Sequence, residues 1–353
     1  MRADLSYGNT RLRARRGELL RDADYERLLG EDVDGLLGAL EDTPYAPDVA
    51  AARGDDGLRR LHQAIGTHLS RSLEEMRSFY TDRARRLVDV LLSHFDLHNV
   101  LAVLRAKAGT QGPADDALIR VGWLVEPLAG ETLGQNELAG AVDLLARSTP
   151  DRKQAGALRA AFGEYEVTED LAALERAVVT DHLARTVADL RAAGPDAATL
   201  LRFAQRAIDE RNLLVVLRLR DALASGAETE PPPSATRLPG GSIPLAVFEQ
   251  ALGAPTSAAV VGGLADAGWQ PPLQRWAASG DLTALERDLE RRCIADAAAL
   301  FVTGDPLAID VPVAFTAAKQ TEARNLRLLG EASVRGIDAE SVRRELLWPE
   351  ARP

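Results

Sequence analysis

The chain has 353 residues, of which 46% are apolar and 27% are charged, and its formal net charge is −11. This composition excludes wholesale disorder, and the negative charge argues against a nucleic-acid binder, whose affinity comes largely from neutralised phosphates. The single cysteine, Cys293, excludes an intrachain disulfide and a cysteine-rich metal or iron–sulfur site. No apolar run approaches the ~18 residues of a membrane span, and the N-terminus lacks a signal-peptide pattern, so we expect a soluble protein.

Helix is expected along almost the whole chain, because Ala, Leu, Arg and Glu dominate the composition and lose little rotamer freedom in helices. In chain order, the predicted helical segments are 17–41, 57–107, 135–165, 170–224 and 281–333. The three longest have apolar residues at three-to-four spacing, and breaks near Gly194 and Gly304 interrupt the last two of these. No long alternating strand pattern is present, so the predicted fold class is all-α.

One polar motif occurs three times. It consists of an acid, two further residues, an asparagine and an apolar run, and it occupies 96–105, 209–218 and 322–331. The asparagines are Asn99, Asn212 and Asn325, each separated from the next by 113 residues. This period is longer than the ~20–50 residues of solenoid repeats, so each copy is predicted to be a domain-sized helical unit. A weaker echo precedes the motifs at Leu73–Glu74, Leu174–Glu175 and Leu285–Glu286.

Loop-like segments set the predicted boundaries of the units. The segment 109–113 closes the first unit, and the proline-rich segment 228–234 closes the second. The predicted units are therefore 1–112, 113–230 and 231–353.

The acid of each motif is expected to be buried. On a helical wheel Asp96 falls among the apolar residues of its helix, and Asn99 lies at the edge of that arc. Because a buried carboxylate without a partner is costly, we expect it to bind an arginine, a helix N-terminus or backbone donors. The triple occurrence favours a polar clamp that fixes helix packing over proton carriage or metal binding. The equivalent pairs are Asp209 with Asn212 and Glu322 with Asn325.

Two further sets of residues are candidates for partner surfaces. The polar face of the motif carries Arg105, Arg218 and Glu331 at equivalent positions, and likewise His98, Arg211 and Arg324. This face either lines a shared interface or is ordinary solvated surface. Near the N-terminus stands a cluster of four arginines, Arg11, Arg13, Arg15 and Arg16. It could contact phosphates or lipid head groups, but a solvated or intersubunit helix face is the preferred interpretation.

Catalytic and cofactor motifs are not found in the sequence. There is no G-x-x-x-x-G-K-[ST] phosphate loop, no dinucleotide-binding glycine pattern and no G-x-S-x-G nucleophile elbow. His94 and His98 share a helix face at a spacing seen in metal sites, but no third ligand is evident nearby. We expect no cofactor, and a helical metalloprotein built on these two histidines remains a minor alternative.

The repeat and four segments resemble the C subunit of bacterial and archaeal V/A-type ATP synthases, the counterpart of the d subunit of the eukaryotic V-ATPase. The segments are 7–20, which begins Tyr-Gly-Asn-Thr-Arg-Leu-Arg, then 40–45, 95–107 and 322–327. The third motif departs from the other two, with Glu322 in place of Asp and Gly330–Glu331 in place of Leu–Arg.

The resemblance implies a funnel of three similar helical domains around a pseudo-threefold axis. It further implies a non-catalytic subunit that links the central stalk to the membrane proteolipid ring and transmits torque between ion flow and ATP synthesis or hydrolysis. Such a subunit would lie peripherally on the cytoplasmic face of the membrane. A generic helical scaffold unrelated to rotary motors is the alternative. The residues to which structural or interface roles are assigned are Tyr7, Arg11, Arg13, Asp96, Asn99, Arg105, Asp209, Asn212, Arg218, Glu322, Asn325 and Arg327.

Overall fold

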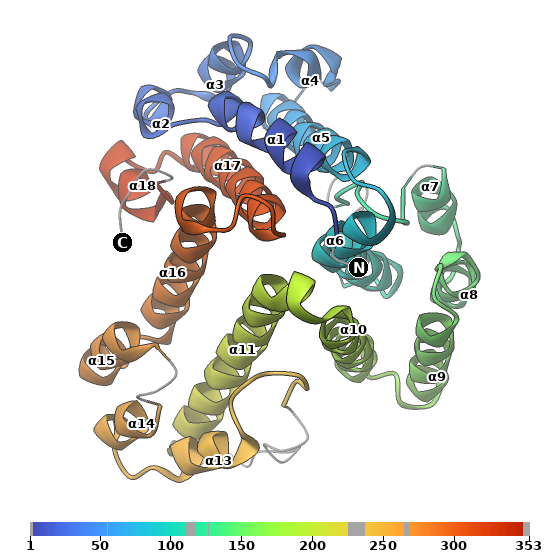
Figure 1. The fold of residues 1–353 in the computed structure, drawn as a ribbon, viewed down its shortest axis with the longest axis vertical. Coiled ribbons are helices and arrows are strands. Elements are labelled where there is room, and N and C mark those ends of the chain that lie inside the picture. Colours follow the sequence, from blue (N-terminus) through green and yellow to red (C-terminus); the bar gives the residue numbers. More distant parts are fainter. Residues whose placement is uncertain are drawn as a thin grey trace. The chain divides into compact units, whose positions relative to one another are not determined.

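The computed structural model describes residues 3–54, 56–110, 118–125, 127–224, 237–264 and 268–348 (Figure 1). Every regular element in these ranges is a helix, which confirms the predicted all-α class. The chain forms two compact units, Met1–His182 with Ala297–Arg352, and Leu183–Asp296. The predicted boundaries of three repeat units, and their pseudo-threefold arrangement, stay predictions.

Unit 1 contains both ends of the described chain. Its helices are α1 (Ser6–Arg15), α2 (Asp22–Leu28), α3 (Val33–Leu40), α4 (Ala46–Ala51), α5 (Gly57–Ser78), α6 (Asp82–Lys107), α7 (Leu128–Leu133), α8 (Leu138–Ser148), α9 (Arg152–Thr168), α17 (Asp310–Arg335) and α18 (Ala339–Glu345), with the first half of α10 (Leu171–Ala193). Helices α1, α5 and α17 lie side by side in it, so the last long helix of the chain packs on the first (Figure 1).

The α5–α17 pair forms the centre of this packing. The buried face of α5 repeats every three or four residues and includes Leu61, Ile65, Leu69 and Met76. A Cβ atom on Gly330 of α17 would lie 2.7 Å from Leu61, so glycine permits the close approach of the two helices. A second apolar cluster of unit 1 joins α6 to α8 and α9.

Unit 2 is built around α11 (Ala198–Ala224). The other helices are the end of α10, the short 3₁₀ turn Gly194–Ala197, α13 (Leu245–Gly253), α14 (Ser257–Gly263), α15 (Gln270–Ser279) and most of α16 (Leu282–Thr303). Its core includes Leu217, Trp269, Trp276 and Leu285, which are nearly or fully buried.

The helix breaks agree with the sequence in part. Gly194 has a φ of 69° and separates α10 from α11, as predicted. Segment 57–107, however, is two helices and not one, because the chain turns after Ser78 and α6 begins at Asp82 with a φ of 49°. Segment 17–41 is likewise divided, at Gly30, whose φ is 85°. The predicted loop 228–234 lies outside the described residues.

Helix α6 is long and apolar enough, by length and composition, to cross a membrane. Half of its most apolar window is buried inside the protein, and among the described residues it is the one helix that meets the criterion. The same helix carries the first polar motif.

Candidate functional site

The first motif binds the segment that follows α6. Asn99 Nδ2 donates a hydrogen bond to the carbonyl of Ile119 at 2.7 Å, and the Ile119 N–H donates to Asn99 Oδ1 at 2.9 Å. One turn earlier, Asp96 Oδ1 accepts from the Trp123 N–H at 2.9 Å. Because a carboxamide has both a donor and an acceptor, Asn99 satisfies both polar groups of one peptide residue. We call this arrangement a backbone clamp.

Burial raises the pKa of Asp96, the acid of the first clamp. Desolvation raises the pKa of Asp96 from 3.8 to about 6, although the backbone N–H of Trp123 lowers it in part. The bound loop passes very close to the carboxylate, since a Cβ on Gly122 would lie 2.2 Å from Asp96 Oδ1. Gly122 also has a φ of 93°. Both the space and the backbone conformation therefore require glycine here.

The second motif forms the same clamp in unit 2. Asn212 Nδ2 donates to the Leu238 carbonyl at 3.0 Å and Oδ1 accepts from the Leu238 N–H at 2.8 Å. Asp209 Oδ2 accepts from the Ser242 N–H at 2.8 Å and from its hydroxyl at 2.7 Å. A glycine again lies against the acid, because a Cβ on Gly241 would be 2.0 Å from Asp209 Oδ1.

The third clamp has two separate partners. Asn325 exchanges hydrogen bonds with the backbone of Leu347 at 2.8 and 3.0 Å, as the other asparagines do with their own following segments. Glu322 Oε1 instead accepts from the N–H of Leu20, near the N-terminus, at 2.5 Å. The third acid therefore ties the first part of the chain to the last long helix.

A buried polar chain extends from Glu322. Its carboxylate pairs with Lys319 at 2.7 Å, and Lys319 Nζ lies 3.1 Å from His68 Nε2. His68 Nδ1 is 2.9 Å from Asp48, which also binds Arg71. Burial and the positive charge of Lys319 lower the pKa of His68 to about 4, so this imidazole is neutral at physiological pH.

Sequence reasoning did not find this chain of contacts. Asp48, His68 and Lys319 are each more than 90% buried, although Asp and Lys are usually exposed. Only Tyr45 could have been found, because it ends the 40–45 segment that resembles the family. Its hydroxyl lies 3.2 Å from Glu322 Oε2, and its ring stacks on His68 with 3.7 Å between centroids.

The side chain at one equivalent position of each motif faces a neighbouring helix. Arg105 binds Glu175 with two hydrogen bonds of 2.7 and 2.8 Å, and Arg218 binds Glu286 at 2.9 Å. In the third copy Glu331 stands at this position and lies 3.8 Å from His62. The third copy therefore has an acid opposite a histidine where the other two copies have an arginine opposite a glutamate.

These contacts show that one of the three members of the weaker sequence echo was assigned wrongly. Leu174–Glu175 and Leu285–Glu286 do supply the ion-pair partners, but Leu73–Glu74 does not correspond to them. Glu74 binds the Gly122 N–H at 3.0 Å and Arg77 at 3.2 Å. The dipeptide Leu61–His62, earlier in α5, is the equivalent of Leu174–Glu175 and Leu285–Glu286. Its Leu61 is fully buried. The number of residues between the echo and the motif asparagine differs among the three copies. This variation already indicated that Leu73–Glu74 was not equivalent to the other two.

The N-terminal candidates lie on α1 and its flank. Tyr7 is 65% exposed, and its hydroxyl accepts a hydrogen bond from Arg11 at 2.9 Å. The Arg11 guanidinium also lies over the Phe79 ring, 4.4 Å from its centroid. Arg13 is exposed, whereas Arg15 pairs with Glu75. This face of α1 is open for contact with another molecule.

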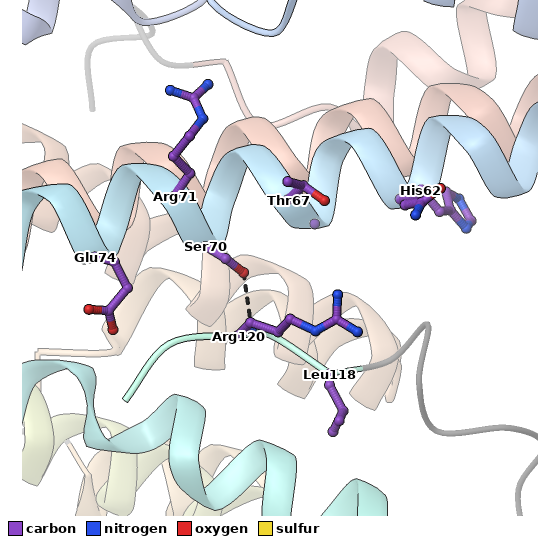
Figure 2. A pocket seen from close by; sticks show the side chains of 9 residues that line it. His62, Thr67, Ser70, Arg71, Glu74, Leu118 and Arg120 are labelled. Atoms are coloured by element: carbon purple, nitrogen blue, oxygen red, sulfur yellow. Dashed lines mark hydrogen bonds between the residues drawn. The ribbon is translucent and has the colours of Figure 1, made fainter. Parts of the chain in front are cut away.

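A polar cleft of about 310 Å³ runs along α5 in unit 1 (Figure 2). It is lined by His62, Gln63, Gly66, Thr67, Ser70, Arg71, Glu74, Leu118 and Arg120. Figure 2 shows the Arg120 side chain extending along α5, below Thr67 and toward His62, while Arg71 points to the other side of the helix. The Arg120 N–H donates to Ser70 Oγ at 3.0 Å and fixes this segment against α5.

One member of the histidine pair considered as a metal site, His94, is engaged in protein contacts. His94 Nδ1 lies 2.8 Å from the Leu91 carbonyl, and His94 Nε2 lies 2.9 Å from Gln320. Within the described part of the chain, no group of three or more His, Cys, Asp and Glu side chains could hold a metal ion.

Fold and site together define an all-helical protein in which the repeated polar residues bind the protein's own backbone. The model of the family described as ATP synthase (C/AC39) subunit matches residues 8–345. The chain belongs to this family, as the sequence resemblance predicted. Its members are structural subunits of the V/A-type ATP synthase, a membrane-associated complex, so other subunits of that complex are its partners.

Individual relatives agree over nearly the whole chain. The C subunit of the V-type ATP synthase of Thermus thermophilus is 30% identical over 361 residues, covering 99% of this chain and 100% of the relative. The C subunit of the A-type ATP synthase of Haloferax volcanii is 26% identical, with 97% of each chain covered. That of Thermococcus kodakarensis is 22% identical over 96% of this chain and 89% of the relative.

Proposed function

We propose that the protein is the non-catalytic adaptor on the central axis of a rotary V/A-type ATP synthase or ATPase. In this role it links the central stalk to the proteolipid ring and transmits torque between ion flow and ATP synthesis or hydrolysis. It has no active site of its own, and it lies on the cytoplasmic face of the membrane without entering the bilayer.

The observation that carries this proposal is the backbone clamp found three times. Each clamp holds a long helix to a separate segment through an asparagine that is nearly inaccessible to solvent, so the helices cannot slide without breaking several buried hydrogen bonds. A part that carries torque needs this stiffness, which close packing and satisfied polar groups supply.

The exposed candidates are assigned to contacts with other subunits. Tyr7, Arg11 and Arg13 form an accessible face whose arginines suit acidic or aromatic partner groups. The clamp residues, by contrast, act inside the fold.

Recovery of the protein from native membranes tests the assembly. A tagged chain should co-purify with central stalk subunits and with proteolipid after mild detergent solubilisation. Recovery of neither would refute the proposal. Coupling is tested separately, because vesicles that contain Asn325→Ala should hydrolyse ATP at an undiminished rate while pumping fewer ions per ATP.

A further inference from the structure

An open groove of about 320 Å³ lies in unit 1 between the turn that joins α2 to α3 and the C-terminal end of α17. Its floor is apolar and consists of buried side chains of α2, α17 and α18, namely Leu28, Leu329, Ala332 and Val342. Gly30 and Gly336 line opposite walls, and a Cβ at either position would meet no atom within 4 Å. Because these glycines carry no side chain, the apolar floor stays accessible from both walls.

An exposed apolar side chain extends this floor to the surface. Ile337, which lines the groove just after α17, is 48% exposed, and Val334 in the last turn of α17 is 61% exposed. Among the described residues only seven large hydrophobic side chains are exposed, so two of them three positions apart are a local concentration. Covering such side chains with another apolar group releases the water around them, which favours contact with a second molecule.

Both charged side chains of the lining are acids. Asp32 Oδ1 accepts from the Gly35 N–H at 2.8 Å, whereas the Glu31 carboxylate has no hydrogen-bond or ion-pair partner among the residues that the structure describes. The end of α17 adds partial negative charge, because the last carbonyls of this 26-residue helix form the negative pole of its dipole. The groove is therefore apolar at its floor and negative at its rim.

The basic side chains of the neighbouring helices are engaged elsewhere. Arg327 of α17 lies against α5, with its Nη2 atom 3.8 Å from the position that a Cβ on Gly66 would take. Arg335, in the last turn of α17, binds Glu331 at 3.0 Å. Arg343 of α18 binds a glutamate of α2. A cation that comes from outside the fold therefore meets acids and helix carbonyls in this groove.

We propose that this groove is the docking site for a segment of another subunit of the complex, and that the segment carries an apolar side chain next to a lysine or arginine. The apolar side chain covers the floor at Leu329 and Val342, and the cationic group binds Glu31 and the carbonyls at the end of α17. The apolar stem and charged tip of lysine or arginine suit such a site. The proposal rests on membership of the complex, and it does not depend on a position between stalk and ring.

Other occupants match the groove less well. A small cation would leave the apolar floor and Ile337 in contact with water. An anionic membrane surface would be repelled by Glu31, by Asp32 and by the net charge of −11. A protein segment that combines an apolar and a basic side chain satisfies both the floor and the rim.

Photo-cross-linking in the purified complex tests the occupant. With p-benzoylphenylalanine in place of Ile337, light makes the ketone insert into a C–H bond of the neighbouring molecule, and mass spectrometry locates the new bond. The expected partner is a peptide of another subunit with a lysine or arginine beside the cross-linked position. The same group in place of Val167, which is 84% exposed on α9, is the control and should not give this product. A bond only within the chain itself, residues 349–353 included, or no bond at all, would overturn the proposal.

Two variants separate docking from folding. Glu31→Lys reverses the charge that holds the cation, and Ser333→Trp fills the groove from α17. Retention in the complex after a salt wash should fall about tenfold for each, as expected when central contacts of an interface are lost. The thermal midpoint of the isolated chain should fall by less than about 4 °C for Glu31→Lys, since this side chain is exposed. Glu166→Lys, at an exposed position of α9, is the matched control and should change neither quantity.

The outcomes keep this inference apart from the proposed function. If the unaltered chain is recovered with stalk and ring while Glu31→Lys is retained as well as its control, the groove is not a docking site and the proposed function stands. If the cross-link reaches another subunit but stalk and ring are not recovered, the groove inference stands and the adaptor role is refuted.

A second copy of the chain is the remaining occupant to be tested. Concentration-dependent dimers of the isolated chain that Ser333→Trp abolishes, with cross-links only between two copies, would assign the groove to self-association and overturn the proposal. Glu31→Lys decides the matter alone if Ser333→Trp does not fold.

Discussion

Glu322 and Leu20 are 302 positions apart in the sequence, and yet the Glu322 carboxylate accepts the hydrogen bond of the Leu20 N–H at 2.5 Å. In the other two clamps the acid binds a segment that follows its own helix. The third acid reaches back to the N-terminal part of the chain, and glutamate is one methylene longer than the aspartate of the other copies. This contact adds to the packing of α17 on α1, α3 and α5, which belong to the same compact unit.

Removal of the Glu322 charge should destabilise unit 1 strongly. Glu322→Gln leaves Lys319, which is 4% exposed, without its carboxylate, and the neutral His68 cannot replace it. Breaking one partner of a buried pair costs about 3–5 kcal/mol. Urea unfolding followed by circular dichroism measures the loss.

The matched control is Glu286→Gln, whose carboxylate is paired with Arg218 but half exposed. It should cost less than about 1 kcal/mol, since exposed pairs contribute little. Equal losses in the two variants would show that the polar chain from Glu322 to Asp48 does not act as a buried unit.

Loss of a clamp asparagine should have similar effects in all three copies. Asn99→Ala leaves the N–H of Ile119 without a partner and removes one of the two hydrogen bonds of its carbonyl, which also accepts from the Val121 N–H, and this should cost about 1–3 kcal/mol. Asn212→Ala and Asn325→Ala should fall in the same range. Asn136→Ala, at an exposed position, serves as the control and should change the free energy of unfolding by less than about 0.5 kcal/mol.

The sequence predicted the class of interaction but not its partners. Asp96 and Asn99 fall on the apolar side of a helical wheel, which is sufficient to predict burial and a need for backbone or arginine partners. Periodicity carries no information on which distant segment supplies those partners, so neither Ile119 nor Leu20 could be named.

The buried polar contacts from Glu322 to Asp48 could not be predicted from the sequence for a related reason. His68 and Lys319 lie on different helices, separated by 251 positions. Both lie on the buried faces of their own helices, but only the packing of α5 against α17 brings the two side chains together. The same packing places Glu331 opposite His62, so the acid at this position of the third copy could not be interpreted from the motif alone.

The glycine against the first clamp should not tolerate a side chain. Gly122→Ala adds a Cβ that would lie 2.2 Å from Asp96 Oδ1, at a φ of 93° that L-residues avoid. The combined clash and strain should cost about 2–4 kcal/mol. Gly109→Ala, which has a φ of 74° but open space around it, isolates the strain and should cost about 1 kcal/mol. If the two variants lose the same stability, the contact with Asp96 is not a constraint.

The first clamp should also make unit 1 sensitive to pH. The pKa of Asp96 is raised to about 6 in the folded chain from an ordinary 3.8, because burial disfavours the carboxylate. The folded state therefore binds more protons than the unfolded state between these values, so the contribution of Asp96 to stability is lost as pH rises through 6. A shift of this size corresponds to about 3 kcal/mol. His68 acts in the opposite direction, since its lowered pKa destabilises the folded state as pH falls from 6.5 toward 4.

Comparison with Asp96→Asn separates these two contributions, because the variant keeps an acceptor for the Trp123 N–H and does not titrate. At pH 7.5 Asp96→Asn should be as stable as the unaltered chain or more so, by up to about 3 kcal/mol. As pH falls to 4.5 the difference should shrink toward zero, because Asp96 becomes protonated and both side chains are then neutral. Urea midpoints at several pH values measure this difference, while the effect of His68 is common to both proteins and cancels. A difference that is constant with pH would mean that the Asp96 carboxylate is no harder to ionise in the folded chain than in the unfolded one.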